Sequence, residues 1–272
     1  VKRVEAPGIE RVNLIDATPI GVNVRSTVAT YSGVLDGLRR AWAAEARKQG
    51  AKLNAGAFSY NTGSLRCPTC EGTGTVQLDV QFLPDVEVPC PDCRGARYGK
   101  EAFGYRLPTE DGSPISLPEL LSCTVEEALA LFPHMKGVSS KLETLVQIGL
   151  GYLTLGEATP ALSGGEAQRL KLASQMKRNQ SDALFVFDEP TVGLHPHDVE
   201  TLLGVFFTLT ENGATVVVIE HDLDMMANAD YLIDMGPGGG EAGGRIVCAG
   251  TPDELCACSD SITGRYLARE IG

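Results

Sequence analysis

The chain has 272 residues, 43% of them apolar, and a formal net charge of −12. This length and apolar content predict a globular protein with one large or two modest domains. The negative net charge excludes attraction of nucleic acid by the protein's overall electrostatic field, so any contact with nucleic acid needs a local basic surface. No apolar run approaches the roughly 18 residues of a membrane span and no signal-peptide core follows Val1, so we expect a cytoplasmic protein with no membrane partner. Because the first residue is Val rather than Met, we also expect a fragment or a trimmed chain.

Near the start of the chain, the pattern predicts a strand, a loop and a helix. The strand is an extended apolar piece, Arg11–Asp16, which ends in a loop broken by Pro19 and Gly21. From about Val34 to Gln49 the apolar residues recur at helical spacing, with basic residues mostly on the other faces. This beginning is typical of a strand that enters a functional loop.

The middle of the chain is predicted to be mainly helical around a small β element. Strict alternation from Val76 to Phe82 predicts a half-buried strand between two pairs of cysteines. A capping-box spacing from Thr124 to Glu127 predicts the start of one helix, and a second is expected from about Ser140 to Ile148.

After residue 155, short apolar runs alternate with helical segments. The runs are Leu184–Phe187, Thr215–Ile219 and Tyr231–Met235, with one helix expected at Asp198–Leu209 between the first two. This order predicts a buried parallel sheet in an α/β layer. A glycine-rich turn, residues 236–244, and a short strand, residues 245–248, follow.

One short segment carries a strong chemical signal at the start of a predicted helix that runs to Met176. In Ser163-Gly164-Gly165-Glu166, the serine can cap the helix, and the two glycine amides can approach an anion such as a nucleotide γ-phosphate. An ordinary capping box explains the serine and the glutamate. It does not explain the paired glycines, which weaken a first turn unless the backbone must approach something closely.

Two later strands end in residues suited to phosphoryl transfer. Asp188 and Glu189 follow the first apolar run, where one carboxylate can hold Mg²⁺ and the next can orient or deprotonate a water. His221 follows the second run, where an imidazole can reach a γ-phosphate. Each signal alone also fits an acidic turn or an incidental histidine, but their order together predicts an ATPase site.

Four of the eight cysteines form two Cys-x-x-Cys pairs. Cys67 and Cys70 precede Cys90 and Cys93 by a spacing that can close a tetrahedral structural Zn²⁺ site. The alternative, two disulfides, requires an oxidising compartment that nothing else in the sequence supports.

These motifs resemble the ATP-binding cassette (ABC) family, and more closely the carboxyl-terminal cassette of the UvrA family of bacterial excinuclease proteins. The similar segments are Ala161–Ser174, Phe187–His195 and Val218–Asp224, with Pro19–Gly21, Arg25-Ser26, Ala29–Tyr31 and Phe82–Val86 upstream. The resemblance covers nearly the whole chain. A transporter cassette lacks such a cysteine module, which makes that alternative weak.

The resemblance implies a damage-sensing ATPase of nucleotide excision repair and the SOS response. It implies ATP and Mg²⁺ as cofactors beside structural zinc, damaged double-stranded DNA and the excinuclease protein UvrB as partners, and a homodimer. It also implies that the segment from Ser163 to Glu166, the signature loop, completes the ATP site of the partner cassette, whereas Asp188, Glu189 and His221 serve the site of their own cassette. The chain would then hold parts of two sites and the whole of neither.

The resemblance further implies an α/β fold. We expect an ABC-type ATPase lobe with a parallel sheet, plus an inserted, mainly helical signature domain that carries a small zinc-binding β module. The expected parts are residues 1–30 in the ATP-binding lobe, 31–155 in the signature domain with the zinc module at about 60–105, and 156–272 in the cassette.

Candidate DNA contacts lie on and after the first helix and around the cysteines. The first group is Arg39, Arg40, Arg47, Lys48 and Lys52, and the second is Arg66, Arg94, Arg97 and Lys100. Phosphate binding needs such clusters. Charge runs are also typical of solvated faces, so the family resemblance carries much of this hypothesis.

Two departures from the family bear on activity. Ala17 stands where the family usually has a Gln that helps to hold Mg²⁺ and the attacking water, and no Gly-x-x-x-x-Gly-Lys-Ser/Thr loop (Walker A) occurs. In the family this loop lies upstream, so we expect the isolated chain to be inactive. A drug-resistance paralogue and a non-enzymatic, zinc-stabilised DNA or protein interaction module remain alternatives.

Overall fold

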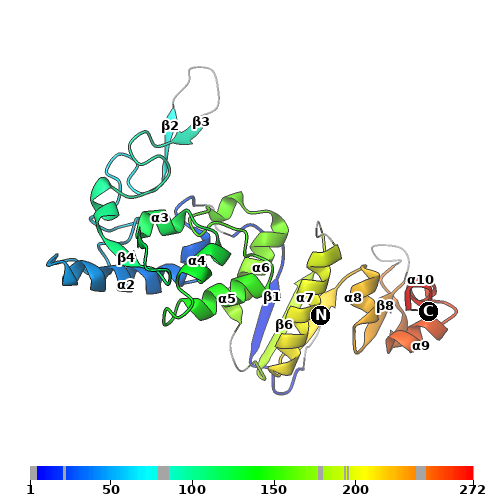
Figure 1. Ribbon diagram of the computed structural model, residues 1–272. Coiled ribbons are helices and arrows are strands. Elements are labelled where there is room, and N and C mark those ends of the chain that lie inside the picture. The colour runs from blue at the N-terminus through cyan, green and yellow to red at the C-terminus, as the bar shows by residue number, and fades with distance from the viewer. Residues whose placement is uncertain are drawn as a thin grey trace. The chain divides into compact units, whose positions relative to one another are not determined.

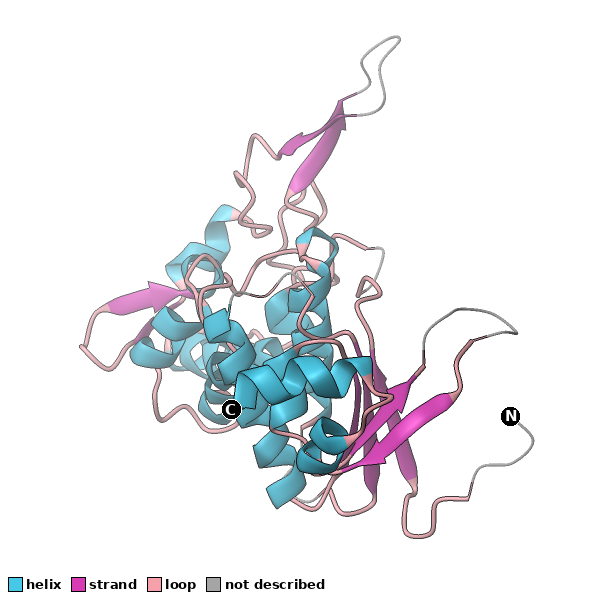
Figure 2. Ribbon diagram, turned by 90° about the vertical axis from the view of Figure 1, so that its right-hand side faces the viewer, coloured by secondary structure: helices cyan, strands magenta, loops and turns pink. Residues whose placement is uncertain are grey.

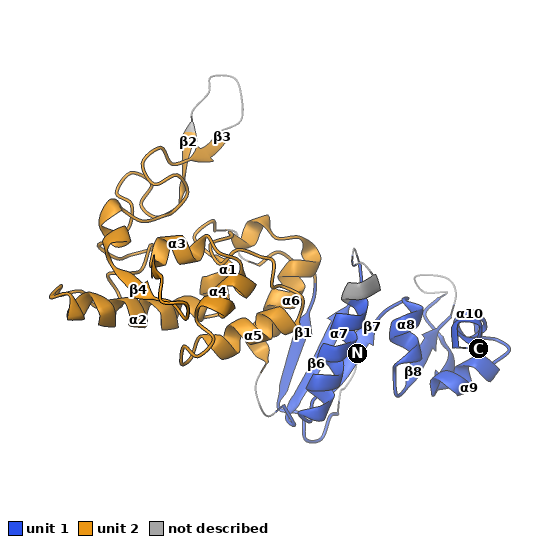
Figure 3. Cartoon of the chain, in the orientation of Figure 1, with its two compact units in different colours: residues 1–16, 177–272 blue, residues 17–176 orange. Residues whose placement is uncertain are grey.

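The structure is a computed structural model that describes residues 5–20, 23–78, 86–176, 180–192, 194, 196–236 and 243–271. The chain forms two compact units (Figure 3): unit 1 comprises residues 1–16 and 177–272, and unit 2 comprises residues 17–176. Several sequence predictions fall outside the described residues, namely those on Gly21, residues 79–85, Gly193, His195 and residues 237–242.

Unit 1 is built on a parallel sheet of three strands in the order β1-β6-β7. Strands β1 and β6 are labelled in Figure 1, and all three are labelled in Figure 3. These strands are β1 (Arg11–Ile15), β6 (Ala183–Asp188) and β7 (Thr215–Ile219). Ile15 pairs with Phe187, which pairs with Val218 on its other side. The prediction of an α/β fold with a parallel sheet is confirmed.

The two faces of this sheet differ in burial. On one face, Phe187 packs against Phe206 of helix α7 (Pro196–Glu211), with 4.6 Å between the ring centroids. On the other face, alternate residues of the outer strands are exposed: Val12 66%, Leu14 60%, Val217 46% and Ile219 55%. The expectation of a buried sheet was therefore wrong for one face of β1 and β7, since only the other face is covered within the described residues.

The end of unit 1 is a separate α+β segment. Strand β8 (Leu232–Met235) pairs antiparallel with β9 (Ile246–Gly250), so it does not extend the parallel sheet, as its sequence had suggested. The helices are α8 (Leu223–Ala227), α9 (Pro252–Ala257) and α10 (Ile262–Ile271). The Asp234 carboxylate accepts hydrogen bonds from Ser261 and Thr263, which attaches the start of α10 to β8.

Unit 2 is mainly helical, and its described strands form two short antiparallel pairs (Figure 2). The pairs are β2 (Thr75–Leu78) with β3 (Val86–Pro89), and β4 (Arg106–Pro108) with β5 (Pro114–Ser116). The helices are α1 (Val28–Tyr31), α2 (Val34–Lys48), α3 (Leu117–Leu121), α4 (Val125–Leu131), α5 (Ser139–Gln147) and α6 (Gly164–Gln175), with 3₁₀ turns η1 (Lys100–Gly104) and η2 (Thr159–Ala161). The predicted capping box at Thr124 and Glu127 is present.

The unit limits differ from the boundaries near residues 30 and 155 that the sequence predicts. Residues 17–30 belong to unit 2 because they bond to its later segments. The amide of Val28 donates to Glu157 O at 3.0 Å, and Lys171 Nζ of α6 donates to Thr18 Oγ1 at 2.7 Å. The signature helix α6 therefore packs with the helical unit, and the predicted boundaries remain a hypothesis drawn from the family.

In the described part of the chain, no helix combines the length and apolar character needed to cross a bilayer.

Helix α2 is fixed to the core of unit 2 by Trp42. Its side chain is fully buried, and its ring meets Phe132 edge-on at 5.7 Å between centroids. The indole Nε1 has no hydrogen-bond partner in the described structure, so the contribution of Trp42 comes from packing.

We expect Trp42→Ala to lower the free energy of unfolding by about 3–5 kcal/mol, because it leaves a large cavity. Trp42→Phe should cost clearly less, since it retains an aromatic ring and removes an unpaired buried N–H. Chemical denaturation followed by circular dichroism measures both, with the exposed Arg40→Ala on the same helix as control. Equal stability of Trp42→Ala and Arg40→Ala would contradict this account of the core.

Candidate functional site

The predicted catalytic acids lie at the carboxyl edge of the parallel sheet. Asp188 is the last residue of β6, and Glu189 follows it with φ of +46°. Such a left-handed conformation costs a non-glycine residue on the order of 1–3 kcal/mol. The Glu189 amide donates to the carbonyl of Ile219, the last residue of β7, at 2.9 Å. The neighbouring strand therefore holds this strained backbone at the edge where open α/β sheets bind ligands.

Glu220 connects the loop after β6 with the loop after β7. Its side chain is 4% exposed. One carboxylate oxygen accepts from the Thr191 amide at 2.8 Å and from the Thr191 hydroxyl, and the other accepts from the amides of His221 at 2.7 Å and Asp222 at 3.1 Å. Burial acts to raise the pKa of Glu220, but these hydrogen bonds outweigh it and hold the pKa below its ordinary value. The buried carboxylate is therefore ionised at neutral pH.

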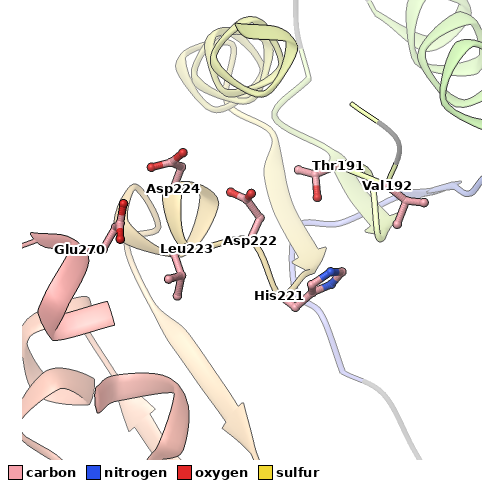
Figure 4. A pocket seen from close by; sticks show the side chains of 7 residues that line it. All are labelled: Thr191, Val192, His221, Asp222, Leu223, Asp224 and Glu270. Carbon is pink, nitrogen blue, oxygen red and sulfur yellow. The ribbon is translucent and has the colours of Figure 1, made fainter. Parts of the chain in front are cut away.

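His221 lies at the end of β7 and is 75% exposed. It borders an open pocket of ≈ 570 Å³ (Figure 4) that is also lined by Thr191, Val192, Asp222, Leu223, Asp224 and Glu270. Its Nδ1 is 3.7 Å from Glu220 Oε2. The pairing of Asp188 with Ile219 places the two predicted catalytic acids beside this histidine segment, although neither acid lines the pocket.

The signature loop begins helix α6 in unit 2. Ser163 Oγ accepts from the Glu166 amide at 3.3 Å, and Glu166 Oε2 accepts from the Ser163 amide at 2.6 Å, which completes a capping box. Tyr152 donates its hydroxyl to Glu166 Oε1 at 2.6 Å. The Glu166 carboxylate therefore shapes the loop, while the first-turn amides of Gly164 and Gly165 have no acceptor within the helix.

Gly164 is in close contact with the loop that contains Ala17. A Cβ added at Gly164 would lie 3.3 Å from the Ala17 Cβ, tighter than ordinary contact. The lack of a side chain at position 164 thus serves a close approach, which the capping-box explanation alone did not account for. Both residues belong to unit 2, so the structure brings together the signature loop and the predicted glutamine-loop position.

The four predicted cysteine ligands form one cluster. Their sulfur atoms all lie within 4.8 Å of one another, with 3.9 Å between Cys67 and Cys90 and 3.6 Å between Cys70 and Cys93. Zinc–sulfur bonds of about 2.3 Å in a tetrahedron place the sulfurs about 3.8 Å apart, so the cluster fits zinc. Burial acts to raise the pKa of Cys70, but the amides of Gly74 and Gly72 and the neighbouring thiols lower it to about 7. This favours the thiolate at Cys70. Burial instead raises the pKa of Cys67 and Cys93.

The cysteine module is attached to the rest of unit 2 by arginine. Arg97 is buried; its Nη1 donates to Val24 O at 2.9 Å and to Gly72 O at 3.4 Å, and its guanidinium lies over the Tyr60 ring. Arg25 Nη1 donates to Glu71 O at 2.7 Å. The prediction of Arg97 as a DNA contact was therefore wrong, because its guanidinium is used inside the protein.

The other predicted DNA contacts differ in their availability. Arg39 pairs with Asp36 and Lys48 with Glu45, while Arg66 donates to Asn61 O. The exposed side chains with no hydrogen bond or ion pair within the described residues are Arg40, Arg47, Lys52, Arg94 and Lys100. Arg40 and Arg47 are seven positions apart on α2, so they share one face of the helix.

Sequence reasoning missed the organising roles of three residues, one of which, Arg97, it had predicted as a DNA contact instead. Glu220, Tyr152 and Arg97 act through contacts with residues far along the chain or through burial that no local spacing reveals. One signal was present for Glu220: it immediately precedes His221 at the end of a strand, where a polar side chain faces a ligand edge.

Replacing Cys90 with Ala should abolish stoichiometric zinc binding, because three thiolates leave the tetrahedral site open. Metal analysis of the purified protein should give about one zinc per chain in the wild type and almost none in Cys90→Ala. Cys123→Ala, a partly buried cysteine outside the cluster, should retain zinc. Full zinc content in Cys90→Ala would rule out this site.

Comparison with known proteins gives one consistent result. No family model matches the chain. The UvrABC system protein A of Clostridium acetobutylicum is 45% identical over 266 residues, which cover 97% of this chain and 28% of that protein. The Bacillus subtilis protein of the same name is 47% identical over 262 residues, which cover 95% of this chain and 27% of that protein.

A solved structure agrees with these sequences. UvrA2 from Deinococcus radiodurans matches with a TM-score of 0.88 and 41% identity over 96% of this chain and 32% of that one. The chain thus spans less than a third of the length of each relative. Similarity of this degree in sequence and fold shows that the chain corresponds to one portion of the UvrA proteins.

Proposed function

We propose that the chain is the carboxyl-terminal ATPase portion of a DNA-damage-recognising ABC protein of nucleotide excision repair. The observation that carries this proposal is the edge of the parallel sheet in unit 1. There Asp188 and Glu189 follow β6, and His221 follows the adjacent strand. Two carboxylates and an imidazole at adjacent strand ends suit a reaction in which Mg²⁺, a water and a phosphoryl group must be aligned.

In this proposal each site residue has a distinct role. Asp188 holds Mg²⁺, Glu189 polarises the attacking water and His221 steadies the transferring phosphoryl group. The amino-terminal end of α6 binds the γ-phosphate of the ATP held by the partner cassette, through Ser163, Gly164 and Gly165. Glu166 shapes that loop. The γ-phosphate of ATP would thus be contacted by the signature loop of one cassette and by the Asp188, Glu189 and His221 group of the other.

Hydrolysis would couple cassette engagement to DNA scanning. The protein acts as a homodimer in the cytoplasm, recognises damaged double-stranded DNA and delivers it to the excinuclease protein UvrB. The cysteine cluster supports a reducing compartment, because it fits zinc with free thiols.

Ala17 modifies this proposal. The family's glutamine at this position helps to hold Mg²⁺ and water, and a methyl group cannot do so. Ala17 instead packs closely on the position of Gly164. We infer slower or less coupled hydrolysis, a property that also suits a drug-resistance paralogue of the repair protein.

A second candidate is a non-enzymatic, zinc-stabilised interaction module. It is favoured by the cysteine cluster that fits zinc and by the exposed Arg40 and Arg47 on α2. ATPase assays of the chain with and without an upstream Walker A segment separate the two candidates. Hydrolysis by the isolated chain would contradict our assignment of a partial site.

In a protein that joins this chain to its Walker A segment, Glu189→Gln should lower ATP turnover by about 10²–10⁴-fold, because it removes the group that polarises water. ATP affinity, measured with a fluorescent analogue, should be retained. Glu211→Gln, at the exposed end of α7, is the matched control. Undiminished turnover in Glu189→Gln would remove Glu189 from this role.

DNA binding should fall as salt rises, because bound arginines release counterions from phosphates. In anisotropy titrations at several salt concentrations, Arg40→Ala combined with Arg47→Ala should reduce the log–log slope by about 2. A matched control removes two exposed charges from α10 of unit 1, Arg265→Ala with Arg269→Ala. An unchanged slope in the α2 variant would exclude this helix face from the DNA interface.

A further inference from the structure

Glu220 holds together the two segments that carry the proposed catalytic residues. Thr191 lies in the loop after β6, which begins with Glu189, whereas His221 and Asp222 lie in the loop after β7. All four of the hydrogen bonds that Glu220 accepts come from these two loops. The Glu189 amide, bonded to Ile219 O, forms a second connection next to it. We call Glu220 and its four donors the carboxylate clasp.

The clasp requires a carboxylate rather than an amide. Oε1 accepts two donors from Thr191, and Oε2 accepts two backbone amides, of His221 and Asp222. A glutamine offers one oxygen and one NH₂ group. In either orientation its NH₂ faces at least one backbone N–H, so the variant loses hydrogen bonds and places two donors against each other. The nearly isosteric change thus disrupts the clasp without removing volume.

The clasp also restricts His221. The backbone on both sides of its Cα atom is fixed, because the amides of His221 and Asp222 both donate to Glu220 Oε2. The imidazole Nδ1 lies 3.7 Å from the same oxygen. The side chain itself is 75% exposed and has little packing of its own. Its position therefore depends on the backbone that Glu220 holds.

We propose that Glu220 is a positioning residue for ATP hydrolysis. It fixes the distance between the Glu189 segment and the His221 segment, which act on the same phosphoryl group. This inference rests on the proposed function, and it adds a residue that the motifs do not assign. Misplacement of a reacting group by about 1 Å can cost on the order of 10²-fold in rate. Loss of the clasp should therefore lower kcat more than it lowers nucleotide affinity.

The test uses a protein that joins this chain to its Walker A segment, and it compares Glu220→Gln, Thr191→Val and Thr191→Ser with wild type. Glu220→Gln should reduce kcat by roughly 10- to 100-fold, with the affinity for a non-hydrolysable ATP analogue nearly unchanged. Thr191→Val removes only the hydroxyl donor, so its loss should be smaller. Thr191→Ser keeps both donors and should retain more activity than Thr191→Val. Glu211→Gln serves as the matched control for loss of one carboxylate.

A second measurement does not depend on turnover. In hydrogen-exchange mass spectrometry, Glu220→Gln should accelerate exchange in peptides that contain Thr191, His221 and Asp222. Peptides from the interior of β6 and from α7 should keep their wild-type protection. That pattern distinguishes loss of the clasp from general unfolding.

The outcomes separate the clasp from the proposed function. An active wild type with equal kcat in Glu220→Gln overturns the clasp and leaves the ATPase assignment intact. A fall in kcat that only matches a loss of folded protein, with protection lost throughout unit 1, also overturns a positioning role. A wild-type protein that joins this chain to its Walker A segment and yet hydrolyses no ATP overturns both.

Discussion

The parallel pairing of β1 with β6 is the constraint on which the rest of the structure depends. Arg11, at the start of β1, bonds to Asp182, 171 residues later in the chain. Parallel neighbours need a crossover connection, commonly a single helix of a dozen or so residues. Here the connection is the whole of unit 2, residues 17–176. The sheet therefore forms only when segments from both ends of this long insertion come together.

This topology divides the proposed chemistry between the two units. Unit 1 contains Asp188, Glu189 and His221, connected through Glu220, whereas unit 2 contains the signature loop from Ser163 to Glu166. Each group has its own local support: a buried carboxylate with four donors in one case, and a capping box with Tyr152 in the other. A division of this kind suits a site that is completed by a second cassette.

The cysteine module shows how a small region with little core is made rigid. Its strands β2 and β3 are four residues each, too short to be stable alone. Four clustered thiols that fit zinc, together with the Arg97 guanidinium over the Tyr60 ring, take the place of an extensive core. Basic residues in this region therefore divide into those used internally, such as Arg97, and those that remain available at the surface, such as Arg94.

The sequence by itself determined the features that rest on local spacing. The cysteine pairs, the capped signature helix, the strand before Asp188 and the strand before His221 follow from periodicity and residue chemistry over short distances, and all are present. Only tertiary structure decided the rest: which sheet face is covered, that β8 pairs outside the parallel sheet, that residues 17–30 join α6, that Arg97 is internal, and that Glu220 bridges two loops. Those outcomes depend on contacts between residues far apart in the chain, which local patterns do not encode.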